Sequence, residues 1–288
     1  MSKLALASET ISAAHSPDDG LTWRERRDWF RSRLQQSPVA GLSPDEVEVH
    51  FNLMPAHYWE RVTEADLIWG LETIHGFFKL VASPHTPPTA PFVDWRSLAP
   101  SPGARVLLCT WNRHGLLAKC AAAFSAVRLN IRRAEVYTRA DNVVLDSFQL
   151  AEVTGAVPVN AVQLQEMSFV LEGALSEPPR FASVWACSRH KYLAQPGTTA
   201  PQISFDNDSA PGHTLIRLEA PDRLGLLYDL LQALADAGLE IAQADIETEA
   251  NLARDVLHVT DALGQKVLAP DRLAEIRAGI HAALTVTG

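Results

Sequence analysis

The sequence predicts an α+β protein in which two copies of one small sheet-and-helix unit follow a helical N-terminal segment. Residues 106–117 and 216–227 read nearly alike: each is a strand, a polar turn with one glycine, and the apolar start of a helix. The match continues at the same offset of 110 residues, because Leu-Asn-Ile at 129–131 answers Leu-Glu-Ile at 239–241. Repeated units with a shared period usually share a fold.

The N-terminal segment carries three helix start signals. Residues 22–25 spell a capping box, in which the threonine hydroxyl and the glutamate carboxylate satisfy helix-end amides reciprocally. Residues 43–46 place a proline at the first helical position, where its missing amide costs nothing. Residues 63–66 precede a stripe of apolar side chains close to the helical period, so we expect this third helix to bury one face.

Two proline-rich stretches, 83–103 and 196–201, forbid a continuous helix and predict linkers. The predicted organisation is a flexible tail over 1–20, a helical segment over 21–83, a first unit over 84–195 and a second unit over 196–288. In the first unit we expect a strand over 104–111, a helix over 115–128, strands over 131–139 and 142–152, and a helix over 159–175. In the second unit the same elements are expected over 213–220, 225–237, 240–249, 253–261 and 270–284.

The order βαββα becomes a ferredoxin-like unit (βαββαβ) when a fourth strand is added. Only residues 285–288 follow the last helix, so the second copy is expected to take its fourth strand from the preceding segment 202–206. Residues 91–94 are expected to do the same for the first copy, and residues 180–186 compete for that position.

Composition and net charge limit the classes of binding partner that we expect. A length of 288 residues with 47% hydrophobic and 20% charged residues is ordinary for a globular protein of two or three domains. The net charge of −9 argues against a nucleic-acid or anionic-membrane partner, since such surfaces need excess Lys and Arg. Three cysteines form no paired framework, and no apolar run reaches membrane length, so we expect a soluble cytoplasmic protein. The arginines at 24, 26, 27, 31 and 33 are expected to form a solvated helix face, with RNA or an acidic partner as the alternative.

The duplicated turn predicts a ligand site. There a strand ends and a helix begins, which leaves amide N–H groups unpaired and a partial positive field suited to a carboxylate. Glycine lets the ligand approach the backbone, and the Asn112 or Asp222 side chain can accept a hydrogen bond from an ammonium group. The second copy is favoured because it keeps a carboxylate, although a plain helix cap, worth about 1 kcal/mol, is the competing interpretation. The candidate effector-binding residues are Asn112, Arg113, His114, Gly115, Leu116 and Ile131 in the first copy, and Asp222, Arg223, Leu224, Gly225, Leu226 and Ile241 in the second.

Residues 203–230 and 255–267 resemble the C-terminal part of the bacterial uridylyltransferase/uridylyl-removing enzymes, which modify the nitrogen regulatory protein PII. Both repeats resemble ACT domains, the small-molecule-sensing modules that this family carries in tandem, and His57-Tyr-Trp-Glu60 resembles the helical stretch before them. The resemblance covers residues 45–288 and implies that a neighbouring unit closes each pocket. At the turns this sequence departs from the family's motif Asp-Arg-Pro-Gly-Leu. It has Asn-Arg-His-Gly-Leu at 112–116 and Asp-Arg-Leu-Gly-Leu at 222–226.

The family's catalytic signatures are a Gly-Ser motif followed by paired acidic residues, and a metal-binding His-Asp dipeptide. Neither dipeptide occurs in this sequence. We therefore expect a non-catalytic regulatory protein, without cofactor or metal, that senses a small amino acid, with glutamine as the first candidate. Two alternatives stay open: a structural or interaction protein whose ACT pair dimerises without ligand, and a uridylyltransferase of PII that uses unrecognised residues. A homodimer through the ACT sheets and a further protein partner are the expected assemblies.

Overall fold

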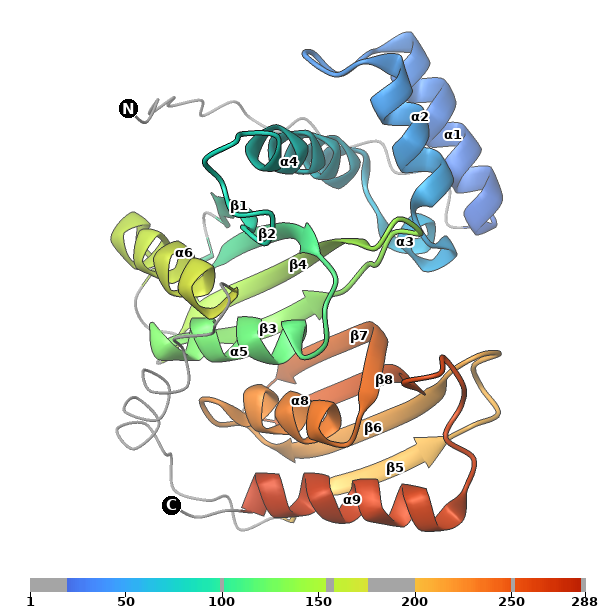
Figure 1. Ribbon diagram of the computed structural model, residues 1–288, viewed down its shortest axis with the longest axis vertical. Coiled ribbons are helices and arrows are strands. Elements are labelled where there is room, and N and C mark those ends of the chain that lie inside the picture. Colours follow the sequence, from blue (N-terminus) through green and yellow to red (C-terminus); the bar gives the residue numbers. More distant parts are fainter. Residues whose placement is uncertain (1–19, 99–100, 154–157, 176–199, 250–251, 286–288) are drawn as a thin grey trace.

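The computed structural model describes residues 20–98, 101–153, 158–175, 200–249 and 252–285. The described chain forms one eight-stranded sheet with helices on both of its faces (Figure 1). Within these residues no helix combines the length and apolar character that a membrane span requires.

The described N-terminal segment contains four helices, and three of them begin at the predicted signals. Thr22 and Glu25 form one capping box and Ser43 and Glu46 form another, while the Thr63 hydroxyl accepts the Asp66 N–H. These side-chain contacts satisfy amides that would otherwise lack a partner at each helix start. The helices are α1 (Trp23–Gln36), α2 (Pro44–Leu53), α3 (Ala56–Arg61) and α4 (Glu64–Val81).

Both repeats have the predicted ferredoxin-like architecture. The first contains β1 (Phe92–Ser97), β2 (Ala104–Trp111), α5 (Leu116–Ala126), β3 (Leu129–Glu135), β4 (Val143–Glu152) and α6 (Ala161–Leu175). The second contains β5 (Gln202–Asp206), β6 (Thr214–Pro221), α8 (Leu226–Asp236), β7 (Leu239–Glu249), β8 (Leu252–Asp261) and α9 (Pro270–Thr285). The strand order is β1-β2-β4-β3 in one unit and, continuing through the sheet, β7-β8-β6-β5 in the other.

The preceding strand occupies the fourth position in each unit. β1 pairs antiparallel with β2, and β5 pairs antiparallel with β6. This confirms the expectation that each copy takes its fourth strand from the segment before it. The competing candidate at 180–186 lies outside the described residues.

The two units meet edge to edge, and β3 pairs with β7 so that one sheet runs through both. In this pairing Glu135 lies opposite Asp245, and these two residues are equivalent in the 110-residue repeat. The units are therefore related by an approximate twofold axis. On the helical face α5 and α8 pack against each other across the same boundary.

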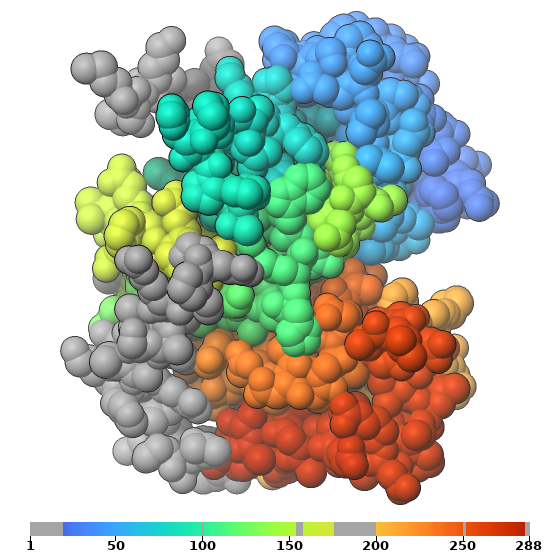
Figure 2. All heavy atoms as spheres, in the orientation of Figure 1, coloured from blue at the N-terminus to red at the C-terminus, as the bar shows by residue number. Residues whose placement is uncertain are grey.

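Two hydrophobic cores lie on opposite faces of the sheet. The core under α5, α6, α8 and α9 is continuous across both units and includes Phe124, Phe148, Leu230, Ile246 and Leu257. The core under the N-terminal helices covers the other face of the first unit only and includes Phe51, Trp59, Leu107, Cys109 and Leu145. Figure 2 shows the blue helical segment against the green first unit, above the orange-red second unit. The N-terminal helices also contact the second unit, because Arg61 at the end of α3 forms an ion pair with Asp245 of β7.

Candidate ligand-binding site

The duplicated turns are called glycine corners below. The first glycine corner is the turn at residues 112–115, which joins β2 to α5. Gly115 precedes the helix with φ at +69°, a left-handed conformation that a residue with a side chain adopts only with strain. A Cβ at this position would lie 3.9 Å from the Cβ of Ala235, which belongs to α8 of the second unit. The turn therefore favours glycine through its left-handed φ, while a Cβ here would make only ordinary van der Waals contact with the second unit.

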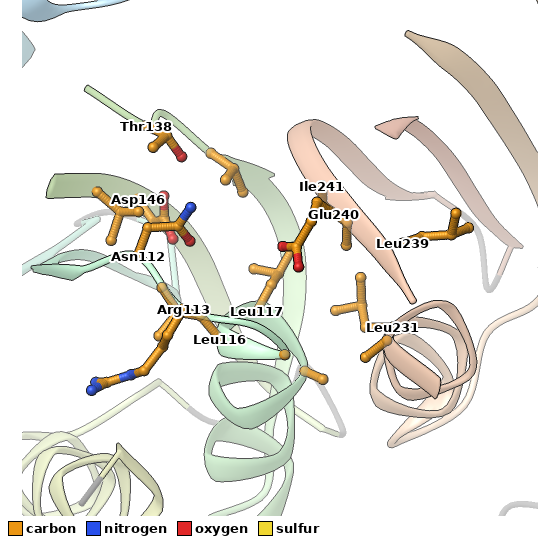
Figure 3. A pocket seen from close by; sticks show the side chains of 15 residues that line it. Asn112, Arg113, Leu116, Leu117, Thr138, Asp146, Leu231, Leu239, Glu240 and Ile241 are labelled. Carbon is orange, nitrogen blue, oxygen red and sulfur yellow. The ribbon is translucent and has the colours of Figure 1, made fainter. Parts of the chain in front are cut away.

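A cavity of about 30 Å³ lies at this corner, between the units. Asn112, Gly115 and Leu116 line it from the corner itself, with Asp146 of β4 beside them. Figure 3 shows Asn112 and Asp146 on this side and Glu240 and Ile241 facing them from β7. The remaining lining residues are Arg113, Leu117, Ala118, Val136, Thr138, Val144, Leu231, Ala235 and Leu239.

His114 bridges the two units at this corner. Its Nδ1 lies 2.8 Å from a carboxylate oxygen of Glu240, and its Nε2 lies 3.0 Å from the carbonyl oxygen of Ala235. The imidazole ring thus contacts an oxygen of the second unit with each of its two nitrogen atoms. Since both side chains are about half exposed, this bridge sits at the solvent side of the cavity.

Asp146 is the buried acid of the cavity. It is 1% exposed, and its Oδ1 accepts the Tyr137 N–H at 3.2 Å. Burial raises the pKa of its carboxyl to about 7, although the Tyr137 N–H acts in the opposite direction. At neutral pH the group is therefore divided between its neutral and ionised forms.

The second glycine corner is the turn at residues 222–225, between β6 and α8. Side chains of the first unit occupy it. Gly225 again has a left-handed φ of +82°. The Asp222 carboxylate accepts the Nδ2–H of Asn130 at 2.8 Å, and the Arg132 guanidinium lies 3.6 Å from the same oxygen. Both partners come from the first unit, so the carboxylate that favoured this corner in the sequence is held by the protein's own side chains.

The predicted residues divide into three groups. Asn112, Arg113, Gly115, Leu116 and Ile241 line the cavity, and His114 bridges the units beside it. Ile131 and Leu226 lie in the hydrophobic core, and Leu224 is buried. The guanidinium of Arg113 donates to the Thr89 carbonyl at 3.2 Å and points away from the other labelled side chains in Figure 3, while Arg223 pairs with Asp229 at 2.6 Å.

Sequence reasoning missed Asp146 and Glu240. One signal was available for Asp146: an aspartate inside an apolar strand, at the position where the second repeat carries Asp255. Glu240 is supplied by the other unit, and its role depends on the β3–β7 pairing. Within the described chain, no group of three or more His, Cys, Asp and Glu side chains is placed to hold a metal ion.

A sequence-family model described as an ACR9-like, ACT-like domain matches residues 202–286. The second repeat is an ACT-like domain. The first repeat has the same elements in the same order, so both are ferredoxin-like units of the ACT type.

The curated relatives are bifunctional uridylyltransferase/uridylyl-removing enzymes. The enzyme of Azospirillum brasilense is 31% identical over 175 residues, which are 60% of this chain and 19% of that enzyme. The enzyme of Nitrobacter winogradskyi is 34% identical over 58% of this chain and 18% of its own length. The enzyme of Ectopseudomonas mendocina is 25% identical over 82% of this chain and 26% of its own length. The chain thus spans about a fifth to a quarter of the relatives it matches.

Among solved structures, the aspartate kinase from Synechocystis is similar over 62% of this chain and 26% of the kinase. The sequence identity is 17% and the TM-score is 0.33.

Proposed function

We propose that this chain is a non-catalytic regulatory protein that binds one free amino acid at the first glycine corner, between its two ACT-like repeats. The observation that carries the proposal is the cavity there, which both repeats line and which the Gly115 turn opens to the start of α5. Glutamine is the first ligand to test, since the resemblance described above points to nitrogen regulation.

The corner offers suitable groups for a zwitterion. The first turn of α5 presents backbone N–H groups and the positive end of the helix dipole, which favour a carboxylate. Asn112 offers an oxygen acceptor to an ammonium group, and Leu231 and Ile241 offer an apolar wall. The ligand would therefore contact both repeats at once.

The small size of the cavity gives the proposal a mechanism. A volume of about 30 Å³ has room for about one water molecule, so an amino acid enters only if the units part at this corner. Parting requires His114 to leave Glu240 and Ala235. A ligand that binds this opened form better than the closed form shifts the packing between the repeats, and that shift is the regulatory signal.

Titration calorimetry of the protein with each of the twenty amino acids tests the proposal. We expect saturable binding of at least one of them, with one site per chain, because Asn130 holds the acceptor of the second corner. Gly115→Val is expected to weaken that binding at least about tenfold, since its side chain would crowd Ala235 and strain the turn.

Gly264→Val is the matched control. Gly264 also has a left-handed φ, +75°, but nothing lies within 4 Å of its Cβ position and it does not line the cavity. It should carry similar strain and keep the binding. The proposal fails if none of the twenty amino acids gives heat or a thermal shift. Retention of full affinity by Gly115→Val would instead move the site away from the first corner and favour an ACT pair that serves only to join the units.

A further inference from the structure

The inner wall of the cavity at the first corner contains the carboxyl group of Asp146, which accepts one hydrogen bond from the backbone. Asp146 lies on β4, on the face covered by α5 and α6, and a backbone N–H from Tyr137 reaches its Oδ1. An aspartate in the hydrophobic core of a sheet is costly unless a partner satisfies it. A further hydrogen-bonding partner for this carboxyl group can therefore lie in the cavity, which Asp146 lines.

The chemistry around this space fits one kind of group. A cavity of about 30 Å³ accommodates a group the size of a water molecule or an ammonium group. An ammonium group has three N–H donors. Three acceptors line this part of the cavity: the Asp146 carboxylate, the Asn112 side-chain oxygen and the Thr138 hydroxyl.

We propose that Asp146 selects ligands that carry a primary ammonium group, and that its carboxylate pairs with that group at the inner end of the cavity. This inference rests on the proposed amino-acid binding and adds the residue that decides which ligands are accepted. The rest of the ligand lies outward, toward the bridge between His114 and Glu240.

Binding of this kind is linked to protons. Burial raises the pKa of Asp146 to about 7. Below that pH the carboxyl is mostly neutral and must release its proton to the buffer when the ammonium group arrives. The resulting pair is two opposite charges in contact, which is far less costly in the interior than either charge alone. Affinity should therefore rise with pH up to about 7 and fall about tenfold per pH unit below it.

Other groups that interact with Asp146 or line the cavity do not supply this dependence. The thiols of Cys109 on β2 and Cys120 on α5 interact with it electrostatically, and burial raises the pKa of both well above the usual value, so both stay neutral. Arg113 is directed to the Thr89 carbonyl and keeps its charge. Glu240 faces the cavity from β7 and is paired with His114. The Asp146→Asn variant removes the ionisable carboxyl of Asp146 and leaves the contact between Glu240 and His114 intact.

The test compares ligands and variants by calorimetry. Each L-amino acid that binds the wild-type protein is compared with its 2-hydroxy acid, in which a hydroxyl group replaces the ammonium group. We expect the hydroxy acid to bind at least about a hundredfold more weakly at pH 8, and Asp146→Asn to bind the amino acid at least about tenfold more weakly. The variant should also lose the dependence of affinity on pH between 6 and 8, and the wild-type protein should release protons on binding at pH 6.5.

Asp255→Asn is the matched control. Asp255 holds the equivalent place in the second repeat, is 2% exposed, and burial raises its pKa to about 7 as well, but it does not line this cavity. This variant should keep the affinity, the ligand preference and the pH dependence of the wild-type protein.

The outcomes separate the two proposals. If the wild-type protein binds no amino acid, both the proposed function and the role of Asp146 fail. If it binds an amino acid and Asp146→Asn binds equally well, or the hydroxy acid equals the amino acid, the role of Asp146 alone fails. The ligand comparison and the pH profile use the wild-type protein, so they decide the question even if the variant does not fold.

Discussion

Asp255→Asn is expected to stabilise the protein by about 4 kcal/mol at pH 8, with a gain that shrinks toward zero as the pH approaches 4. The pKa of the Asp255 carboxyl is raised from 3.8 to about 7, chiefly by burial, with a smaller contribution from the charge of Asp222. At about 1.4 kcal/mol per pKa unit, this difference gives the expected size of the effect. One of its two oxygens, Oδ1, is buried without a hydrogen-bond partner among the described residues.

The sign follows from which state holds the proton. Between pH 4 and 7 the folded protein keeps the Asp255 proton, while the unfolded chain, with its usual pKa near 3.8, has released it. Stability from this group is therefore fully present below about pH 4 and is lost as the pH rises through 7. Asparagine fills the same volume and cannot ionise, so it removes that loss.

Guanidinium unfolding curves between pH 4 and 8 measure this effect. Asp208→Asn, at an exposed position, is the control and should change the free energy of unfolding by less than about 0.5 kcal/mol at every pH. A decrease in stability of Asp255→Asn at pH 8 would show that the ionised carboxylate is satisfied in the folded protein, contrary to this account.

Arg26→Met is expected to destabilise the protein by about 2 to 4 kcal/mol. Arg26 is 9% exposed, and its guanidinium donates to the carbonyl oxygens of Trp59 at 2.7 Å and Val62 at 3.2 Å. These carbonyls lie at the C-terminal end of α3, where a helix has no internal donors left and favours a positive charge. Methionine has a similar length but leaves both buried carbonyls without these bonds.

Arg24→Met on the same helix is the control for Arg26. Arg24 is exposed and stacks over Trp23 at 4.7 Å, so its replacement should cost less than about 1 kcal/mol. Denaturant unfolding at constant pH compares the two variants. Equal stability of the two would mean that the bonds from Arg26 to α3 contribute nothing beyond a surface contact.

Local signals in the sequence predicted the order of most elements, although the strand expected over 131–139 is β3 at Leu129–Glu135. The helix starts at Thr22, Ser43 and Thr63 depend on bonds that span three residues, so the pattern alone reveals them. The fourth strand of the second copy was expected in the segment 202–206 that precedes it, and the pairing of β5 with β6 confirms this. Both inferences use information that lies within one repeat.

The features that the sequence did not predict depend on distant partners. The bond between Asn130 and Asp222 joins residues 92 positions apart, and it closes the corner that the sequence favoured. The expectation of a solvated arginine face was correct for Arg24 and wrong for Arg26, whose carbonyl partners are 33 and 36 residues away. Which acid faces the cavity likewise depends on the contact between units, because Asp146 and Asp255 look alike within their repeats.

The pairing of β3 with β7 joins the two halves of the proposed ligand site within one polypeptide. A receptor assembled from two separate subunits comes apart on dilution, so its half-saturation point drifts with protein concentration. Here the covalent connection keeps the halves together at any dilution, and a single proposed site per chain gives a simple hyperbolic dose–response curve. The same midpoint and a Hill coefficient of one are thus expected at nanomolar and at micromolar protein, as binding measurements across that range can check.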